Sequence, residues 1–272
     1  MAPSLLVDQP GEQLIAAPAR PLDKRIIKTS TPNPSLQVTA DHQLKSVNAP
    51  VYAPGFAKGA LLEPLSVVMH GMRSTGLSLG RGVVVCGAGP IGLIALAAAR
   101  ASGAHPIVIT DLEPSRLAFA KDFVPSCITY QVDRTKDAQG NAQAIRTVFG
   151  DSEYVAPDTV LECTGVESSM CTAAYTARRG STVMVIGVGK AMMNNLPFMH
   201  LSLAEIDLRF NNRYCDTWPP AIQCLSGGIL DLTKLVPHVF PLEKAEEALH
   251  LCADTRNGSI KVMVVDDQEA SL

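Results

Sequence analysis

An apolar run leads directly into a glycine pattern in Val83-Val84-Val85-Cys86-Gly87-Ala88-Gly89-Pro90-Ile91-Gly92. The run predicts a buried strand and the alanine-rich segment after it predicts a helix, so G-x-G-x-x-G falls in the turn between them. Gly87 permits the tight turn, Gly89 lets the backbone approach a pyrophosphate, and Gly92 lets the helix lie close to the strand. The free N–H groups at the helix N-terminus favour phosphate. The pattern alone also fits a glycine-rich turn without a ligand.

The next apolar run, residues 107–110, ends in Asp111, 19 residues beyond Gly92. A carboxylate there can accept hydrogen bonds from both ribose hydroxyls of NAD and would repel the 2′-phosphate of NADP. The alternative is that Asp111 caps the helix beginning near Pro114. With turn and carboxylate in register, we expect dinucleotide binding with NAD favoured, another Rossmann ligand such as S-adenosylmethionine being the alternative. Arg116, on the first turn of that helix, either reaches the ribose or adenine edge or is an ordinary surface arginine.

From Gly59 onward strands and helices alternate, the signature of a parallel sheet with crossover helices. The expected strands are residues 82–86, 106–110, 127–131, 158–162, 181–186 and 205–210. The expected helices are residues 60–75, 90–102, 114–124, 138–149, 167–178 and 217–226, followed by a helix from about Pro241 to Cys252 and a strand over 259–265. We therefore predict an α/β fold, a doubly wound parallel sheet of the Rossmann type.

Two later segments place glycine at the carboxyl end of an expected strand, where open α/β sheets hold ligands. They are Glu162-Cys163-Thr164-Gly165 and Val185-Ile186-Gly187-Val188-Gly189. These glycines also fit plain turns.

The composition excludes several classes of protein. The 272 residues are 47% hydrophobic and 18% charged, which excludes a disordered chain, and the net charge of −3 without a basic run argues against a nucleic-acid partner. Residues 82–99 carry no charge, but the glycines and Pro90 interrupt them, so we predict strand, turn and helix rather than a membrane span. Seven scattered cysteines without Cys-x-x-Cys, and no signal peptide, predict reduced thiols in a cytoplasmic protein.

From Phe56 to about Asp266 the chain closely resembles the zinc-dependent medium-chain polyol dehydrogenases. This group contains the sorbitol, xylitol and L-arabinitol 4-dehydrogenases, and the last are the most similar. The resemblance is carried by residues 59–67 (GALLEPLSV), 86–92, 108–111 with Arg116, 161–169 (LECTGVESS), 185–189, 212–214 (NRY) with 217–219 (TWP), and 258–261 (GSIK).

The resemblance implies NAD-dependent oxidation of a polyol secondary alcohol of the L-arabinitol, xylitol or sorbitol type by hydride transfer. Arg213 and Tyr214 would also face the polyol, the alternatives being a surface salt bridge for Arg213 and a core aromatic for Tyr214. The implied cofactor-binding residues are Gly87, Gly89, Pro90, Ile91, Gly92, Asp111, Arg116, Ile186, Gly187, Val188, Asn211, Asn212 and Arg213.

Similar enzymes also use a catalytic zinc, which polarises the alcohol oxygen. The zinc lies in a GroES-like domain, held by a Cys and a G-H-E motif near a glutamate that matches Glu63. The catalytic residues that the resemblance implies are Glu63, Arg213 and Tyr214. This chain has neither G-I-C-G-S-D nor G-H-E, so Glu63 is the one zinc-site residue that remains. His70 follows on the same predicted helix, but about 10 Å along the axis, too far to share a metal. Surface or capped core positions are expected for the other histidines, His42, His105, His200, His238 and His250.

These observations divide the chain into four parts. They are a proline-rich mobile extension (1–34), a remnant of the catalytic domain (35–58), an NAD-binding Rossmann domain (59–240), and a C-terminal helix and strand that pack with the catalytic domain in similar enzymes (241–272). On the order of 100 residues of that domain are missing between Gly55 and Phe56.

Two functions follow. The first is an NAD-dependent polyol dehydrogenase; the alternative is a non-catalytic NAD-binding or oligomerising remnant, able to pair with an intact homologue. A short-chain reductase would need Tyr-x-x-x-Lys, which the sequence lacks. Because residues 241–252 and 259–265 would expose apolar faces and an unpaired strand edge, we expect a homo-oligomer with no membrane partner.

Overall fold

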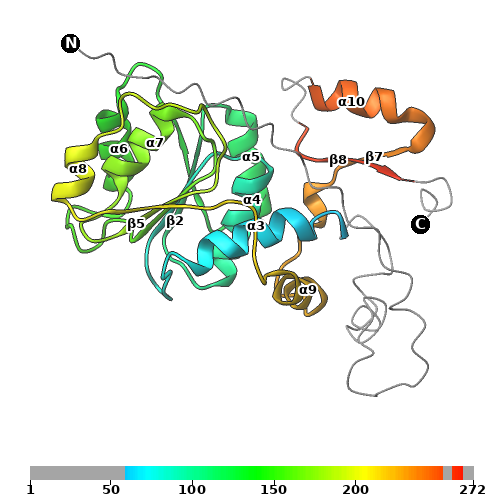
Figure 1. The fold of residues 1–272 in the computed structure, drawn as a ribbon, viewed down its shortest axis with the longest axis horizontal. Helices are drawn as coiled ribbons and strands as arrows, with labels where there is room; N and C mark the ends of the chain where they lie inside the picture. Colours follow the sequence, from blue (N-terminus) through cyan, green and yellow to red (C-terminus); the bar gives the residue numbers. More distant parts are fainter. Residues whose placement is uncertain (1–58, 254–258, 266–272) are drawn as a thin grey trace, which may run out of the picture. The chain divides into compact units, whose positions relative to one another are not determined.

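A six-stranded parallel sheet in the order β3-β2-β1-β4-β5-β6 forms the centre of the molecule (Figure 1). The computed structural model describes residues 59–253 and 259–265. The strand order reverses between β1 and β4, which confirms the predicted doubly wound sheet. All six predicted strands are present. Their bounds are Val83–Cys86 (β1), Ile107–Asp111 (β2), Ile128–Gln131 (β3), Thr159–Glu162 (β4), Thr182–Val185 (β5) and Asp207–Phe210 (β6).

Helices cover both faces of this sheet, as Figure 1 shows. One face carries α3 (Leu62–Arg73), α4 (Pro90–Ala101) and α5 (Pro114–Phe123). The other carries α6 (Ala138–Thr147), α7 (Glu167–Thr176) and α8 (Phe198–Leu203). Helix α9 (Trp218–Ser226) packs against α3.

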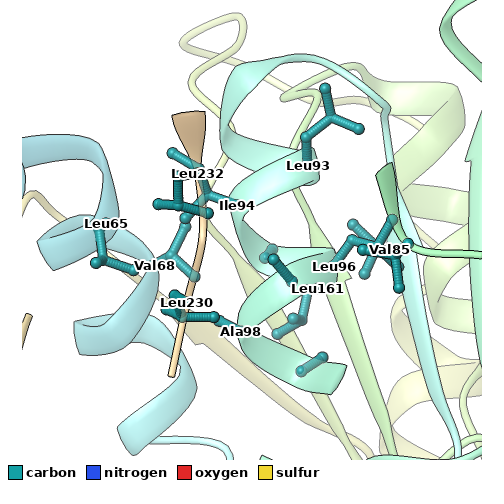
Figure 2. Close-up of a cluster of buried hydrophobic side chains, with 14 of the residues drawn as sticks. Leu65, Val68, Val85, Leu93, Ile94, Leu96, Ala98, Leu161, Leu230 and Leu232 are labelled. Carbon is teal, nitrogen blue, oxygen red and sulfur yellow. The ribbon is translucent and has the colours of Figure 1, made fainter. Parts of the chain in front are cut away.

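The core consists of two layers, because successive strand residues point to opposite faces of the sheet. Val83 and Val85 pack beneath α3 and α4, whereas Val84 and Cys86 pack toward α7 and α8. Side chains from α3, α4, β1, β4 and residues 230–232 meet in the first layer (Figure 2). A sheet buried on both faces explains why β1 has no polar alternation.

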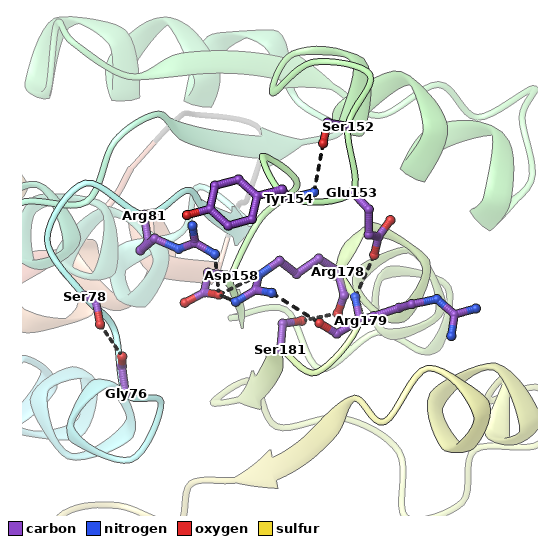
Figure 3. A network of polar contacts seen from close by, with 10 residues as sticks. All are labelled: Gly76, Ser78, Arg81, Ser152, Glu153, Tyr154, Asp158, Arg178, Arg179 and Ser181. Atoms are coloured by element: carbon purple, nitrogen blue, oxygen red, sulfur yellow. Dashed lines mark hydrogen bonds and ion pairs between the residues drawn. The ribbon is translucent and has the colours of Figure 1, made fainter.

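A polar network joins the amino ends of three strands (Figure 3). Asp158, just before β4, accepts hydrogen bonds from Arg81 Nη2 at 3.3 Å and from Arg178 Nε at 2.6 Å. The Arg81 guanidinium also lies 4.9 Å from the ring centroid of Tyr154. Since Arg81 precedes β1 and Arg178 precedes β5, these contacts brace the sheet at the edge opposite its carboxyl ends.

The C-terminal part forms a second, two-stranded parallel sheet of β7 (His238–Pro241) and β8 (Val262–Val265). The expected helix from Pro241 begins as a 3-10 turn, η3 (Leu242–Lys244), and becomes α-helical at α10 (Ala245–Ala253). A further 3-10 turn, η2 (Thr233–Leu235), precedes β7.

Two elements were not predicted. β7 and α8 were missed because four residues ending in proline and a six-residue helix are too short to show a period. The expected boundary after residue 240 falls inside β7. β8 pairs with β7 along one side, so its other side has no partner strand among the described residues, in line with the expected unpaired edge.

Some expectations fall outside the described residues, namely the extension 1–34 and the whole catalytic-domain remnant, residues 35–58. None of the helices in the described ranges has the length and apolarity to cross a bilayer. Residues 82–99 instead contain β1, the glycine turn and most of α4, as predicted.

The contact between the glycine turn and α4 generates a stability prediction. A Cβ on Gly92 would lie 1.8 Å from the Gly87 carbonyl oxygen, so Gly92→Ala should lower the free energy of unfolding by about 1–3 kcal/mol or more in urea titrations. The control is Gly89→Ser, because a Cβ there has no heavy atom within 4 Å and serine is a favoured helix N-cap. Equal stability of the Gly92 variant and the control would contradict this account of the turn.

Candidate functional site

The glycine turn lies at the carboxyl end of β1, next to the point where the strand order reverses. Gly87 has φ +96°, which favours glycine, and its N–H donates to Thr110 O at 2.8 Å. Gly89 is the N-cap residue of α4, and Pro90 occupies the first helical turn and is exposed. The open space beside Gly89 is what a ligand approaching the helix N-terminus requires, so the fold itself makes no use of the missing side chain there.

Asp111 closes the turn from the neighbouring strand. Its Oδ2 accepts a hydrogen bond from the buried N–H of Ala88 at 2.7 Å, and its Oδ1 accepts from Glu113 N at 2.9 Å. The alternative role as a helix cap is wrong, because Glu113 is the N-cap residue of α5 and Asp111 bonds to it from outside the helix. A carboxylate has about four acceptor positions, so two remain for ribose hydroxyls.

Two further expected cofactor residues flank this turn. Arg116 lies half-buried on the first turn of α5, and its guanidinium has no hydrogen bond or ion pair to the described residues. Ile91, also half-buried, packs against the apolar layer beneath α4. Arg116 is therefore available to a ligand. The Ile91 side chain packs in the core, so only its backbone can contact a ligand at the turn.

The glycine turns after β4 and β5 pack against each other backbone to backbone. A Cβ on Gly187 would lie 2.1 Å from Gly165 N, and one on Gly189 would lie 1.7 Å from Gly165 O. Val188, between them, is 93% exposed. Ile186 differs from expectation: its side chain is buried against Gly71 of α3, so its backbone alone can face a ligand.

Sequence reasoning assigned no role to Glu162, the buried carboxylate beneath these turns. Its Oε1 accepts from Thr164 N at 3.0 Å and Ser169 Oγ at 2.9 Å, and its Oε2 accepts from Gly165 N at 2.9 Å. The sequence did contain a signal for this role, because Glu162 is a charged residue at the end of an otherwise apolar strand, just before a glycine turn. Glu162 holds the β4–α7 turn in shape from below.

The same carboxylate acts on a neighbouring thiol. Burial, and then the negative charge of Glu162, raise the pKa of Cys86 to about 12, so this thiol stays protonated and unreactive. All seven cysteines are free, and Cys215 and Cys252 are the exposed ones. The absence of disulfide bonds among these seven cysteines agrees with the prediction of reduced thiols.

The segment after β6 brings the last group of expected residues to the same edge. The Asn211 N–H donates to Val185 O at 2.9 Å, and its Nδ2 donates to Val67 O at 3.1 Å, which ties α3 to the sheet. Its Oδ1 is buried and without a hydrogen-bond partner among the described residues. Asn212 is exposed beside it.

Arg213 and Tyr214 follow in the loop between β6 and α9. Arg213 is exposed with φ 58°, and the salt bridge weighed as its alternative role is not formed with any described residue. Tyr214 is half-buried, with its ring centroid 5.9 Å from that of Trp218. Both residues therefore lie near the surface, where a substrate could reach them.

Glu63 is exposed in the first turn of α3, and the structure does not bring it together with other metal-binding side chains. The described residues contain no group of three or more His, Cys, Asp or Glu that could hold a metal ion. His70, on the same helix, instead lies 3.3 Å from Arg73 Nη2 through its Nδ1. The donor set of the described residues therefore does not fit a resident zinc.

The same residues do fit a dinucleotide. The space beside Gly89, the acceptor positions left on Asp111 and the unpartnered Asn211 Oδ1 all lie at the carboxyl ends of the strands. Open α/β sheets bind dinucleotides across this edge, where the strand order reverses.

Comparisons with known proteins agree with this geometry. Residues 90–227 match a family model described as zinc-binding dehydrogenase. The chain is 50% identical over 219 residues to L-arabinitol 4-dehydrogenase of Aspergillus oryzae, covering 79% of this chain and 57% of that protein. It is 42% identical over 212 residues to sorbitol dehydrogenase of Mus musculus, covering 78% and 57%. The chain thus spans little more than half the length of these relatives.

A solved structure shows the same fold. The crystal structure of 2R,3R-butanediol dehydrogenase from Bacillus subtilis matches with a TM-score of 0.67 and 25% identity, over 78% of this chain and 58% of that one.

Replacing the buried carboxylate of Glu162 should destabilise the turn that it holds. Glu162→Gln exchanges an acceptor for an NH₂ group and leaves a buried N–H of the turn unpaired, which should lower the free energy of unfolding by about 1–3 kcal/mol. Urea titration measures the change, with Ser169→Ala as a control that removes one hydrogen bond at the same carboxylate. Equal stability of Glu162→Gln and the unaltered chain would contradict the role given to Glu162.

Proposed function

Since this chain belongs to the zinc-binding dehydrogenase family, we propose that it binds NAD and oxidises a polyol secondary alcohol of the L-arabinitol, xylitol or sorbitol type. The chain is similar to proteins named L-arabinitol 4-dehydrogenase and sorbitol dehydrogenase, whose names indicate polyol substrates. The observation that carries the proposal is the Asp111 carboxylate held against the glycine turn at the reversal of strand order.

In this proposal the first half of the edge holds the adenosine and pyrophosphate. The N-terminus of α4 offers unsatisfied N–H groups and a partial positive charge to the phosphates, and Gly89 leaves them room. Asp111 accepts the ribose hydroxyls with its remaining acceptor positions. Its negative charge disfavours a 2′-phosphate, so NAD is preferred over NADP.

The second half of the edge would receive the nicotinamide and the substrate. The turn of Gly187 and Val188 and the segment of Asn211 and Asn212 line this side, and bound NAD supplies the hydride acceptor. Arg213, exposed and cationic, and Tyr214, with its hydroxyl group, are the residues we propose to orient the polyol through hydrogen bonds. No step is assigned to zinc, because the described donors do not fit one.

The organisation of the whole chain is part of the proposal. We retain residues 59–240 as the NAD-binding domain, residues 35–58 and 241–272 as parts of a second domain, and the cytoplasm as the compartment. Exposed apolar side chains in the C-terminal part, including Leu249 at 69% exposure, favour association with a second copy or an intact homologue, which sedimentation would detect as a mass above one chain.

The direct test of the function is NADH formation by the chain with L-arabinitol, xylitol and sorbitol, together with its zinc content. We expect NADH formation with at least one of these polyols. The control is the same buffer without any polyol, glycerol included. Binding of NAD without NADH formation would contradict the dehydrogenase proposal and favour the non-catalytic alternative.

The cofactor preference rests on Asp111 and can be tested by calorimetric titration. Asp111→Ala should weaken NAD binding by about tenfold to a hundredfold, since a hydrogen bond to a charged group contributes roughly 1.5–3 kcal/mol. The discrimination against NADP should decrease at the same time. Thermal unfolding of the variant separates this effect from loss of the Ala88 contact, and unchanged affinity for both cofactors would refute the assignment.

A further inference from the structure

The segment between β5 and α8 is fixed at its first end by glycine packing. Gly187 and Gly189 lie so close to Gly165 that a Cβ on any of the three would overlap backbone atoms of the facing turn. The path of the chain up to Gly189 is therefore set by the β4–α7 turn.

The same segment is fixed at its second end by two side chains of α7. Glu167 Oε1 accepts three hydrogen bonds, from Asn194 N at 3.1 Å, Asn195 N at 2.7 Å and Asn195 Nδ2 at 2.8 Å. One helical turn later, Cys171 Sγ donates to Asn195 O at 3.3 Å. We call the Glu167 carboxylate with Asn194 and Asn195 the Glu167 clasp.

Electrostatics keep the clasp closed at neutral pH. The hydrogen bond from Asn195 N, followed by those from Asn195 Nδ2 and Asn194 N and the nearby charge of Lys190, lowers the pKa of Glu167 below its usual range. The carboxylate is therefore ionised near neutrality, and hydrogen bonds to an ionised acceptor are stronger than those to a neutral one.

Apolar side chains are exposed at the carboxyl edge, both on the glycine-packed turns and between the two anchors. Val188 is 93% exposed, Met192 is 74% exposed, and Val166, adjoining the facing turn, is 54% exposed. Asp111 and α4 define the adenosine half of the edge, so the base of the second nucleotide lies on the side of β4 and β5. A flat ring lying there would cover apolar side chains that are otherwise in water.

We propose that Glu167 is a positioning residue for the nicotinamide half of the cofactor. Its carboxylate holds Asn194 and Asn195 against α7, and this fixes residues 190–193, with the exposed Met192, beside the glycine-packed turn that carries Val188. Glu167 acts through the segment and need not touch the cofactor. The inference rests on the proposed NAD binding and adds to it the residue that sets the shape of the second half-site.

The test compares two ligands and two variants of the full chain. NADH contains the nicotinamide ring, whereas ADP-ribose retains the adenosine, both phosphates and the second ribose but lacks that ring. Glu167→Ala should weaken NADH binding by about tenfold, the loss expected for hydrogen bonds to one charged group, and leave ADP-ribose binding unchanged. Glu167→Gln, which keeps an acceptor oxygen, should fall between Glu167→Ala and the unaltered chain. Glu243→Ala, which removes an exposed carboxylate elsewhere, is the matched control.

Hydrogen exchange of residues 190–195 provides the second readout. We expect faster amide exchange there in Glu167→Ala and no change in Glu243→Ala. Faster exchange with unaltered NADH affinity would show a merely structural contact and overturn the proposal, as would equal weakening of both ligands or unaltered exchange. Failure of the unaltered chain to bind either ligand would instead contradict the proposed function, so the two failures are distinguishable.

Discussion

Backbone packing without room for side chains is the constraint on which the carboxyl edge of this protein depends. Gly92 lies against the carbonyl of Gly87, and Gly187 lies against the amide of Gly165. Where two turns meet at backbone distance, a single methyl group would force them apart. The strands can therefore end at one level, and backbone as well as side chains lines the edge, so that a dinucleotide can approach closely.

The two carboxylates at this edge, Glu162 and Asp111, have different roles because their burial and hydrogen-bond partners differ. Glu162 is fully buried and accepts hydrogen bonds from the turn above it. Burial first, and then the charge of Glu162, raise the pKa of the Cys86 thiol and keep it protonated. Asp111 is half-buried, anchors the turn through two backbone N–H groups, and retains acceptor positions toward the outside. At the opposite edge Asp158 is matched by two arginines and serves the sheet alone. Of these acidic groups, Asp111 is the one arranged to meet a ligand.

The sequence allowed the sheet, its helices except α8, and the turn of residues 87–92 next to Asp111 to be predicted, because each rests on local signals. The apolar run before Gly87 and the spacing to Asp111 depend on neighbouring residues in the chain. Long-range packing decided the rest. Ile186 turns its side chain toward α3, and β7 is a strand because β8 pairs with it, neither of which a local pattern contains. The contacts of Glu167 with residues 27 and 28 positions away are of the same kind.

Whether the carboxyl edge between β2 and β6 is a dinucleotide site can be measured by the amide chemical shifts of the chain titrated with NAD. We expect the largest shift changes at the glycine turn of residues 87–92, at Asp111 and at residues 187–188. Changes confined to another concave surface, such as the cleft lined by Ala97, Phe123 and Ile229, would contradict it.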